Sequence, residues 1–436
     1  MKKYYILIIT YLVSVLSSSV ANMLGIDVQR FYRVPFLGIR WIDVAILLIV
    51  GTYGFNLTRN NSLVKKTAFI ITLCLIYLLF ETLQLIRSWH ATDTGWQISG
   101  FLCTLNFFIL IDFSTYTKAP DKILLFLKDF ALLGALVIIA INSYLVYSFI
   151  SGNVIFTDLD TRVAIDVAGA KETVSTVVLT PFVYAFSLYF INAESKFWKK
   201  AIYITAILSI YLSLIITFHR GNLATVFLLT IIYISFFSKR PAQAFSRIFG
   251  LALFICIGYL SFGGILRQKG YDPVDKISEI VNFTMDVDNP DWDKGRAIPK
   301  EYALAAWHKN IGFGVGYNDL YHYGLPEGMG AVHNFVIASL FYRGIIGTML
   351  YLLILIILFG NSIKFWHLLK REENPENDIF KLLIIVSFCW LIPFWTQDVM
   401  WEKYSLSIQF IYLGIISNVY RQKVSQSTTN PISVLN

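Results

Sequence analysis

Charged residues are scarce in this 436-residue chain, because Lys, Arg, Asp and Glu together account for only 15% of it. Soluble domains carry about 25% charged residues, so the composition argues against an ordinary soluble fold. Cysteine is also rare, and the four thiols show no CxxC or Cys/His spacing. A disulfide framework and a zinc site are therefore not expected. The thiols, all inside apolar runs, are Cys74, Cys103, Cys256 and Cys389.

Hydrophobic residues make up 56% of the chain and gather into runs of the length that a bilayer requires. These runs predict an all-α, polytopic membrane protein with about 12 transmembrane helices. We interpret the N-terminal run as an uncleaved first span and not as a signal peptide. The predicted spans are 4–20, 41–57, 67–87, 97–117, 130–150, 172–192, 200–218, 221–238, 246–262, 333–360, 379–396 and 403–420.

Basic residues gather in alternate connections between these spans, which explains the net charge of +8 without a nucleic-acid partner. The positive-inside rule places the richer set of connections, and both termini, in the cytoplasm. The richer set holds Lys2, Lys3, Arg59, Lys65, Lys66, Lys118, Lys122, Lys128, Lys196, Lys199, Lys200, Lys239, Arg240, Arg247, Lys364, Lys370, Arg371, Lys381, Arg421 and Lys423. The poorer set holds Arg30, Arg33, Arg40, Arg87, Arg162, Lys171, Arg220 and Lys403.

The chain thus divides into nine spans over residues 1–262, a large outer loop over 263–332, three spans over 333–420 and a cytoplasmic tail over 421–436. The outer loop is the one extramembrane segment long enough to fold.

Within the outer loop, residues 299–310 predict an amphipathic helix with Pro299 in its first turn. Gly312, Gly314 and Gly316 follow, either as a phosphate-binding turn or, as their spacing alone favours, as a helix stop and tight turn. The acidic stretch 286–293 fails the spacing of an EF-hand, so we expect a solvated acidic loop, and a looser metal site is the alternative.

Three residues fall on the outer face by this topology. Arg220 begins a span, Arg296 precedes the loop helix and His333 begins another span. Singly, each has an ordinary explanation as a boundary residue. Together they predict an anionic ligand held by guanidinium groups, with an imidazole available as a base.

Two charges lie inside predicted spans, Glu81 in the outer half of the third and Arg343 ten residues into the tenth. Charges within a membrane are costly and usually pair or mark function. We therefore hypothesise an ion pair between Arg343 and Glu81.

Three segments, in order, resemble the signatures of the bacterial O-antigen ligase and polysaccharide polymerase family. The first is Phe218-His219-Arg220-Gly221-Asn222-Leu223, which opens a span. The second is Gly295-Arg296, an amphipathic helix, and then Gly312-Phe-Gly314-Val-Gly316. The third is His333-Asn334 followed by Gly344 and Gly347. The resemblance covers roughly residues 210–360.

This resemblance implies a GT-C-like membrane glycosyltransferase in the bacterial inner membrane, with its active site on the periplasmic or outer face. Its donor would be an undecaprenyl-diphosphate-linked glycan, transferred with inversion to a sugar hydroxyl without a metal or other cofactor. The acceptor would be a second lipid-linked glycan or lipid A–core, and a chain-length regulator is a conceivable partner.

By the same resemblance His333 is the general base, and Arg220 and Arg296 stabilise the leaving diphosphate. The substrate-binding set predicted beside them is His219, Asn334, Arg343, Gly314, Gly316 and Glu81.

One departure from the family pattern is Tyr342, which stands where members often carry an acid. Glu81, Asp398 and Glu402 are candidates to supply that acid from elsewhere. The competing interpretation is a lipid-linked oligosaccharide flippase or another secondary transporter. That class predicts internal repeats and broken helices or charges near the midplane.

Overall fold

The computed structural model describes residues 1–23, 41–59, 68–89, 94–116, 118–151, 156–157, 160–163, 166–167, 170–217, 220–237, 294–318, 320–325, 334–370, 374–391 and 403–429, with the single residues 246, 250, 253, 257 and 332. Helices dominate it. They are α1 Lys2–Met23, α3 Trp41–Arg59, α4 Ala68–Arg87, α5 Thr94–Thr104, α6 Phe107–Thr115, α7 Pro120–Ser151, α8 Glu172–Ala193, α9 Phe197–Thr217, α10 Arg220–Phe237, α13 Lys294–His308, η2 Leu320–Tyr323, α14 Phe335–Lys370, α15 Pro375–Cys389 and α17 Lys403–Thr429.

Four short strands form two antiparallel hairpins in the connection between α7 and α8. The strands are β1 Phe156–Thr157, β2 Asp160–Val163, β3 Asp166–Val167 and β4 Ala170–Lys171. The helical architecture is confirmed, with these hairpins as a small addition that the apolar pattern did not indicate.

Four helices in the described part of the chain are long and apolar enough to cross a bilayer. They cover Phe69–Arg87, Pro120–Tyr147, Phe197–Leu214 and Phe335–Lys370. Shorter apolar helices cover Trp41–Tyr53, Gly100–Thr115, Leu179–Ala193 and Asn222–Phe237. The chain is therefore consistent with a helical membrane protein, while the number of about 12 spans and the GT-C likeness stay predictions.

A helix occupies each predicted span except 246–262, most of which lies outside the described residues. The boundaries differ where local chemistry overrides the apolar pattern. Helix α7 begins at Pro120, ten residues before the predicted start at 130. Proline suits a first helical turn, and the negative charge of Asp121 interacts favourably with the positive end of the helix dipole.

The predicted span 97–117 is two helices, because the chain breaks between α5 and α6 at Leu105 and Asn106. The Asn106 side chain donates to the Cys103 carbonyl at 3.0 Å and accepts a hydrogen bond from Ser407 of α17. A local side-chain partner of this kind competes with the helix ladder.

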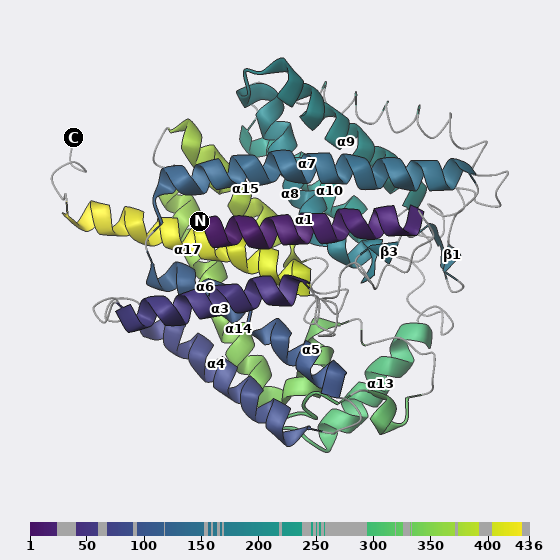
Figure 1. The fold of residues 1–436 in the computed structure, drawn as a ribbon, viewed down its shortest axis with the longest axis vertical. Coiled ribbons are helices and arrows are strands. Elements are labelled where there is room, and N and C mark those ends of the chain that lie inside the picture. The colour runs from purple at the N-terminus through teal and green to yellow at the C-terminus, as the bar shows by residue number, and fades with distance from the viewer. Residues whose placement is uncertain are drawn as a thin grey trace.

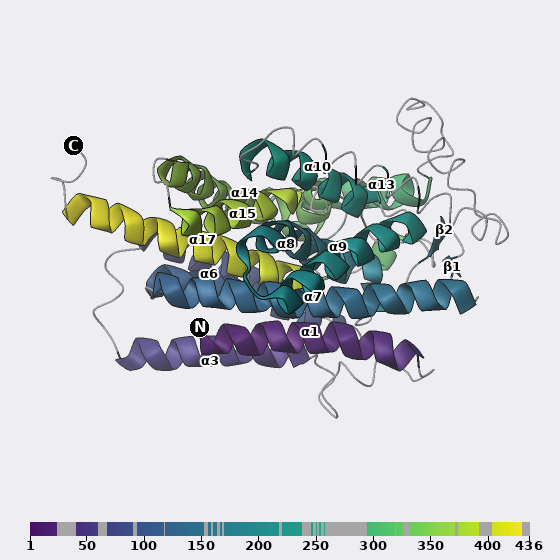
Figure 2. The ribbon, with the colours of Figure 1, turned by 90° about the horizontal axis from the view of Figure 1, so that it is seen from above.

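The helices stack in layers (Figure 2). Helices α1 and α3 pack together on one side, α7 crosses between α1 and the pair α8 and α9, and α10, α14 and α15 lie on the other side. Helix α17 packs against α6, α14 and α15. This arrangement buries one large apolar core that extends through most of the helices.

Large apolar side chains are exposed on the outside of this bundle. Phe69 and Ile86 of α4, Phe227 of α10 and Ile356 of α14 are each at least 65% exposed. Patches of this extent would be a liability in water but are normal against lipid.

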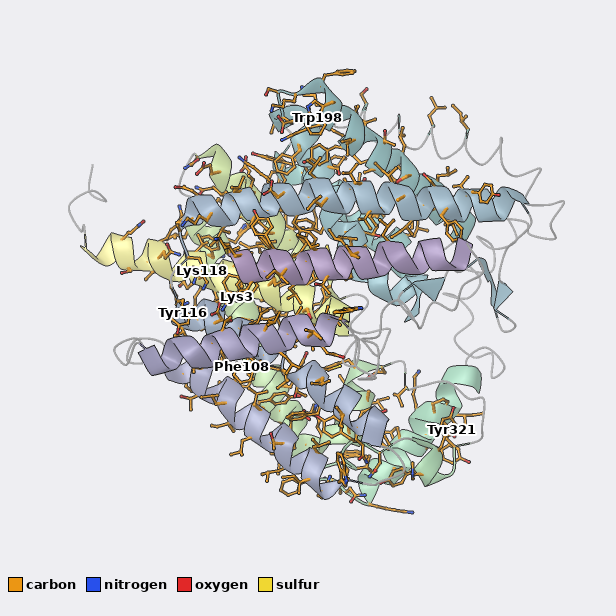
Figure 3. The ribbon with its side chains drawn as sticks, in the orientation of Figure 1. Lys3, Phe108, Tyr116, Lys118, Trp198 and Tyr321 are labelled. Carbon is orange, nitrogen blue, oxygen red and sulfur yellow. The ribbon has the colours of Figure 1, made fainter. Side chains whose placement is uncertain are left out.

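The two ends of the bundle differ in what they carry. The start of α1 and the end of α17 lie toward one end, and α13 and the hairpin strands lie toward the other (Figure 1). Lys3 and Lys118 are at the terminal end, whereas Tyr321 of η2 is at the far end beside α13 (Figure 3). The distribution matches the sidedness expected from the basic residues, which itself stays a prediction.

Candidate functional site

A buried ion pair joins α4 to α14. The Nε of Arg343 donates to Oε1 of Glu81, and both residues are nearly inaccessible, at 3% and 1% exposed. The pairing hypothesised from the sequence is thereby confirmed. The second carboxylate oxygen of Glu81 accepts a hydrogen bond of 2.7 Å from the Tyr317 hydroxyl. The carboxylate thus ties two helices to the outer-loop segment that carries Tyr317.

The Arg343 guanidinium also lies over the ring of Tyr77, 5.9 Å from its centroid. An arginine beside an aromatic face gains electrostatic stabilisation in a desolvated site. Breaking a buried pair leaves an uncompensated charge, so this cluster must form as a unit.

Helix α14 is interrupted next to this pair, at Gly344, whose φ of 62° and ψ of −167° are far from helical. That combination is essentially restricted to glycine. The interruption releases backbone groups that the helix would otherwise pair, and in a membrane such groups need other partners.

The predicted glycine turn supplies those partners. The N–H groups of Val315 and Gly316 donate to the carbonyls of Phe341 and Tyr342, at 2.8 and 2.9 Å. In return, the N–H groups that follow the break donate to carbonyls of the turn, at 2.9 and 3.1 Å. The donors are Ile345 and Ile346, and the acceptors are Ile311 and Gly312. The outer loop therefore completes the backbone hydrogen bonding of an interrupted helix.

These four backbone hydrogen bonds between residues 311–316 and 341–346 form an interlock, and it requires the two backbone segments to approach closely. A Cβ at Gly314 would overlap the backbone of Gly344, and a Cβ at Gly344 would overlap the backbone of Gly312 and Gly314. A Cβ at Gly316 would lie 2.7 Å from that of Ser88, the residue that follows α4. The N–H of Gly314 donates to the Asn310 carbonyl, so the amides of Gly314, Val315 and Gly316 all donate to carbonyls of the protein. These contacts favour the tight-turn interpretation of the glycines, and their contact with substrate stays a prediction.

The C-terminal end of α4, with the Ser88 that follows it, contacts the same turn from the other side. Gln84 and Arg87 donate to the Phe313 carbonyl, and Arg87 also donates to that of Gly314. The Ser88 hydroxyl accepts from the N–H of Tyr317 at 2.9 Å. This role of Gln84, Arg87 and Ser88 was not predicted from the sequence. Its signal was present, because Glu81, Gln84 and Ser88 follow a helical i, i+3, i+7 spacing and so form one polar stripe.

The loop helix α13 packs onto the start of α14 through a small apolar cluster that includes Ala303, Ala306, Ala338 and Phe341. It begins at Lys294 and not at Pro299, so the predicted start was five residues too late. Tertiary packing of its alanine face explains why the helix continues through a proline that sequence rules place in a first turn.

Two of the residues assigned by resemblance lie at helix starts. Arg220 is the first residue of α10, and Arg296 is in the first turn of α13; for both, the description extends to the backbone alone. His219 and His333 lie outside the described residues, as do Asp398 and Glu402.

Asn334 caps α14. Its side-chain oxygen accepts from the N–H of Ile337 at 3.1 Å, and its carbonyl accepts from that of Ala338 at 2.9 Å. Asparagine is among the strongest N-cap residues. The cap gives Asn334 a structural role beside its predicted contact with substrate.

No group of three or more His, Cys, Asp or Glu side chains that could hold a metal occurs among the residues that the structure describes. The acidic stretch 286–293 is outside them.

No protein-family model and no curated protein sequence matches this chain.

Proposed function

We propose that this protein is a metal-independent membrane glycosyltransferase that transfers a polyprenyl-diphosphate-linked glycan to a sugar hydroxyl on the outer face of the bacterial inner membrane. The observation that carries the proposal is the interlock between the glycine turn and the break in α14. It brings together the segments that resemble the second and third family signatures, although about 30 residues separate Gly314 from Gly344.

The chemistry follows from the donor. The oxygen of an acceptor hydroxyl attacks the anomeric carbon while the bond from that carbon to the diphosphate oxygen breaks. The electron pair leaves with the polyprenyl diphosphate, and His333 takes the hydroxyl proton as general base. Attack opposite the leaving group inverts the anomeric configuration.

Arg220 and Arg296 are assigned to the diphosphate. Negative charge grows on the leaving group as the glycosidic bond breaks, and preorganised positive groups stabilise such a charge in the transition state. Guanidinium cannot lose its proton at working pH and can hold two phosphate oxygens at once, which suits this role better than an ammonium.

Glu81 is proposed as the acid that the family pattern places near position 342. The support is its hydrogen-bonded pairing with Arg343, the residue that follows Tyr342. In this chain the carboxylate would come from α4 and not from α14 itself.

The acceptor defines two activities. A polymerase extends a second lipid-linked glycan, and a ligase uses lipid A–core. A polymerase is our preference, and the neighbouring genes separate the two: a flippase and many glycosyltransferases accompany a polymerase, whereas core-biosynthesis genes accompany a ligase.

The transporter alternative has one observation in its favour, the interrupted helices at Asn106 and Gly344. Broken helices in transporters expose backbone groups to a substrate or ion. Near Gly344, amides of the outer loop donate hydrogen bonds to the carbonyls of Phe341 and Tyr342. These carbonyls are therefore not free to bind a substrate or ion, which favours a structural break over a transport site.

The decisive experiment is glycan transfer by the purified protein in detergent or vesicles. Lipid-linked glycan from cells lacking the gene serves as substrate, and longer or transferred glycan with released polyprenyl diphosphate is the product. We expect His333→Ala and Arg220→Ala to abolish transfer. Thermal unfolding should show that both variants are as well folded as the unmodified protein. Full transfer by both folded variants would refute the site, and movement of intact lipid-linked glycan across vesicles without new glycosidic bonds would support the transporter.

A further inference from the structure

The glycine turn carries two large apolar side chains that are exposed on the surface of the protein. Ile311 is 48% exposed and Phe313 is 51% exposed, although Gly314 and Gly316 beside them are buried. The turn lies where the C-terminal end of α4 meets the segment between α13 and α14, at one edge of the molecule (Figure 1). Single exposed apolar residues are ordinary, but a contiguous apolar patch marks contact with a partner or a membrane.

The surface of α4 beside the turn is apolar and exposed. Leu83 and Ile86 are 55% and 68% exposed. The Phe313 ring contacts two residues of this helix: its centroid is 6.1 Å from that of Phe80 and 5.8 Å from Cζ of Arg87. At about 100° per residue, these two residues lie about 20° apart around the helix and about 40–60° from Leu83. Phe313 therefore lies along the edge of the exposed apolar face of α4.

Helix α14 borders the turn with a second exposed apolar surface. The N–H groups of Ile345 and Ile346 donate to carbonyls of the turn, and the two side chains are 44% and 41% exposed. Met349, about one helical turn further along, is 61% exposed. Both α4 and α14 are long and apolar enough to cross a bilayer. Ile311 and Phe313 thus lie between the exposed apolar surfaces of two candidate spans, and this continuity favours lipid as the material that covers them.

The position of the turn along α4 indicates its depth. The apolar segment Phe69–Arg87 extends about 27 Å at about 1.5 Å per residue, close to the hydrocarbon thickness of about 30 Å. Arg87 is then at the boundary of the hydrocarbon, and Phe80 lies about 10 Å inside it. Because the Phe313 ring contacts both residues, it lies between these two levels, among acyl chains close to the headgroups.

The backbone of the turn suits this boundary. The carbonyls of Ile311, Gly312, Phe313 and Gly314 all accept hydrogen bonds from the protein, as contact with hydrocarbon requires. The N–H groups of Ile311, Gly312 and Phe313 donate to no partner in the described part of the chain. Their acceptors must come from the surroundings. The ester and phosphate oxygens of lipid headgroups supply acceptors at the boundary, whereas the hydrocarbon does not.

Arg87 adds a positive charge at the same level. Within the described part of the chain its hydrogen bonds all come from Nη2, which donates to Oε1 of Gln84 and to the carbonyls of Phe313 and Gly314. A guanidinium has five N–H groups, so those of Nε and Nη1 are available to a further acceptor. Arginine at the end of a span usually reaches the headgroups, and its planar group can hold two phosphate oxygens at once.

From this geometry we infer that the glycine turn is inserted into the surface of the bilayer, with Ile311 and Phe313 among the acyl chains and Arg87 bound to the phosphate of a phospholipid. The ligand is an ordinary membrane phospholipid, so the inference does not depend on the proposed reaction. The turn that completes the hydrogen bonding of α14 thus contacts lipid with its exposed side chains. This contact holds the outer loop against the membrane at the level of the break in α14.

Photocrosslinking in vesicles tests this inference with a matched set of positions. The photoreactive p-benzoylphenylalanine replaces Phe313, or Leu79, which is 62% exposed about 12 Å from Arg87 along α4, or Glu301, an exposed charged residue of α13. Full-length protein is placed in vesicles of phosphatidylglycerol that contain a smaller share of the diacylglycerol with the same acyl chains. After illumination, the mass of each adduct identifies what was crosslinked.

We expect lipid adducts at positions 313 and 79 and none above background at 301. Because Arg87 binds a phosphate beside Phe313, the ratio of phosphatidylglycerol to diacylglycerol adducts should be several-fold higher at 313 than at 79. Arg87→Gln should lower the ratio at 313 to the value at 79. Arg87→Lys, which keeps a positive charge, should retain part of the preference. Thermal unfolding verifies that both variants are folded, and the comparison of 313 with 79 requires neither of them.

Two results would overturn the insertion of the turn. Lipid adducts at 313 that are no more frequent than at 301 would show that the turn faces water. Adducts at 313 that join two copies of the chain, in place of lipid, would assign the patch to a dimer interface. Equal adduct ratios at 313 and 79 in protein that retains Arg87 would refute the phosphate site.

Discussion

Two buried carboxylates, Glu81 and Asp112, hold the described helices together in different ways. Glu81 pairs with an arginine that is itself inaccessible and bonds to a loop residue, Tyr317. Asp112 of α6 pairs with two lysines that keep partial contact with solvent, Lys3 and Lys118, at 18% and 14% exposed. The Glu81 network is therefore closed to solvent, whereas the Asp112 network is in partial contact with it.

Their surroundings differ in the same sense. At the Asp112 end, Tyr4 also bonds the carboxylate, and Arg421 of α17 donates to the carbonyls of Phe113 and Ser114. These contacts fasten both terminal helices to α6. At the Glu81 end the bonded partners belong to α14 and to the outer loop, which also carries the predicted reaction residue Arg296. The same chemistry thus serves assembly at one end and, by our proposal, the active site at the other.

The largest effect is expected for Arg343→Ala, which leaves Glu81 buried without its cation. Removing one partner of a buried pair costs about 3–5 kcal/mol, so unfolding in detergent should shift strongly and transfer should be lost. The sharper variant is Glu81→Met/Arg343→Met, which removes both charges at similar volume and should recover most of the stability. If that double variant also recovers full glycan transfer, the Glu81–Arg343 pair serves only to hold the helices together. Glu81 and Asp112 would then have the same role.

A second large effect is expected for Gly344→Ala. The backbone conformation at this residue costs a non-glycine side chain about 1–3 kcal/mol, and the new Cβ would also push the glycine turn away from α14. The matched control is Gly360→Ala in the same helix, where a Cβ meets open space and should stabilise by about 0.5–1 kcal/mol. Thermal unfolding compares the two variants. Equal stability would mean that the interlock is not formed in the membrane.

A moderate effect is expected for Asp112→Asn, which removes the charge shared by Lys3 and Lys118. Burial lowers the pKa of Lys118 while Asp112 raises it, so loss of the carboxylate should lower that pKa further. Charge-assisted hydrogen bonds contribute about 1.5–3 kcal/mol, which sets the expected loss of stability. Glycan transfer per folded molecule should be unchanged. A fall in kcat that exceeds the loss of folded protein would show that this end also governs the reaction.

The smallest effect is expected for Asn334→Ala, since loss of an N-cap typically costs about 1 kcal/mol. Asn334→Asp keeps a capping oxygen and should restore the stability of α14. Measuring kcat/KM for both variants distinguishes a cap from a substrate contact. Activity that returns with Asp indicates capping, whereas activity lost in both indicates that the amide itself contacts substrate.

Much of the architecture was readable from the sequence, because lipid imposes a simple rule on it. Backbone groups in hydrocarbon must pair within their own segment, so long apolar runs become helices. The helices therefore begin and end near the predicted spans, as in α8 and α10. The Glu81–Arg343 pair was readable for a related reason, since two isolated charges in apolar runs need each other.

Tertiary structure decided the rest. The break between α5 and α6 depends on Ser407, and the break at Gly344 depends on a turn about 30 residues earlier in the chain. Hydropathy cannot anticipate either, because each interruption is stable only when a distant segment satisfies the groups it releases. By itself, the sequence determined which segments enter the membrane and which charges must be paired. Packing decided where the helices are interrupted and which distant residues hydrogen-bond to the groups at each interruption. The physical reason is that backbone hydrogen bonding in a membrane must be completed by whichever partner the fold brings near.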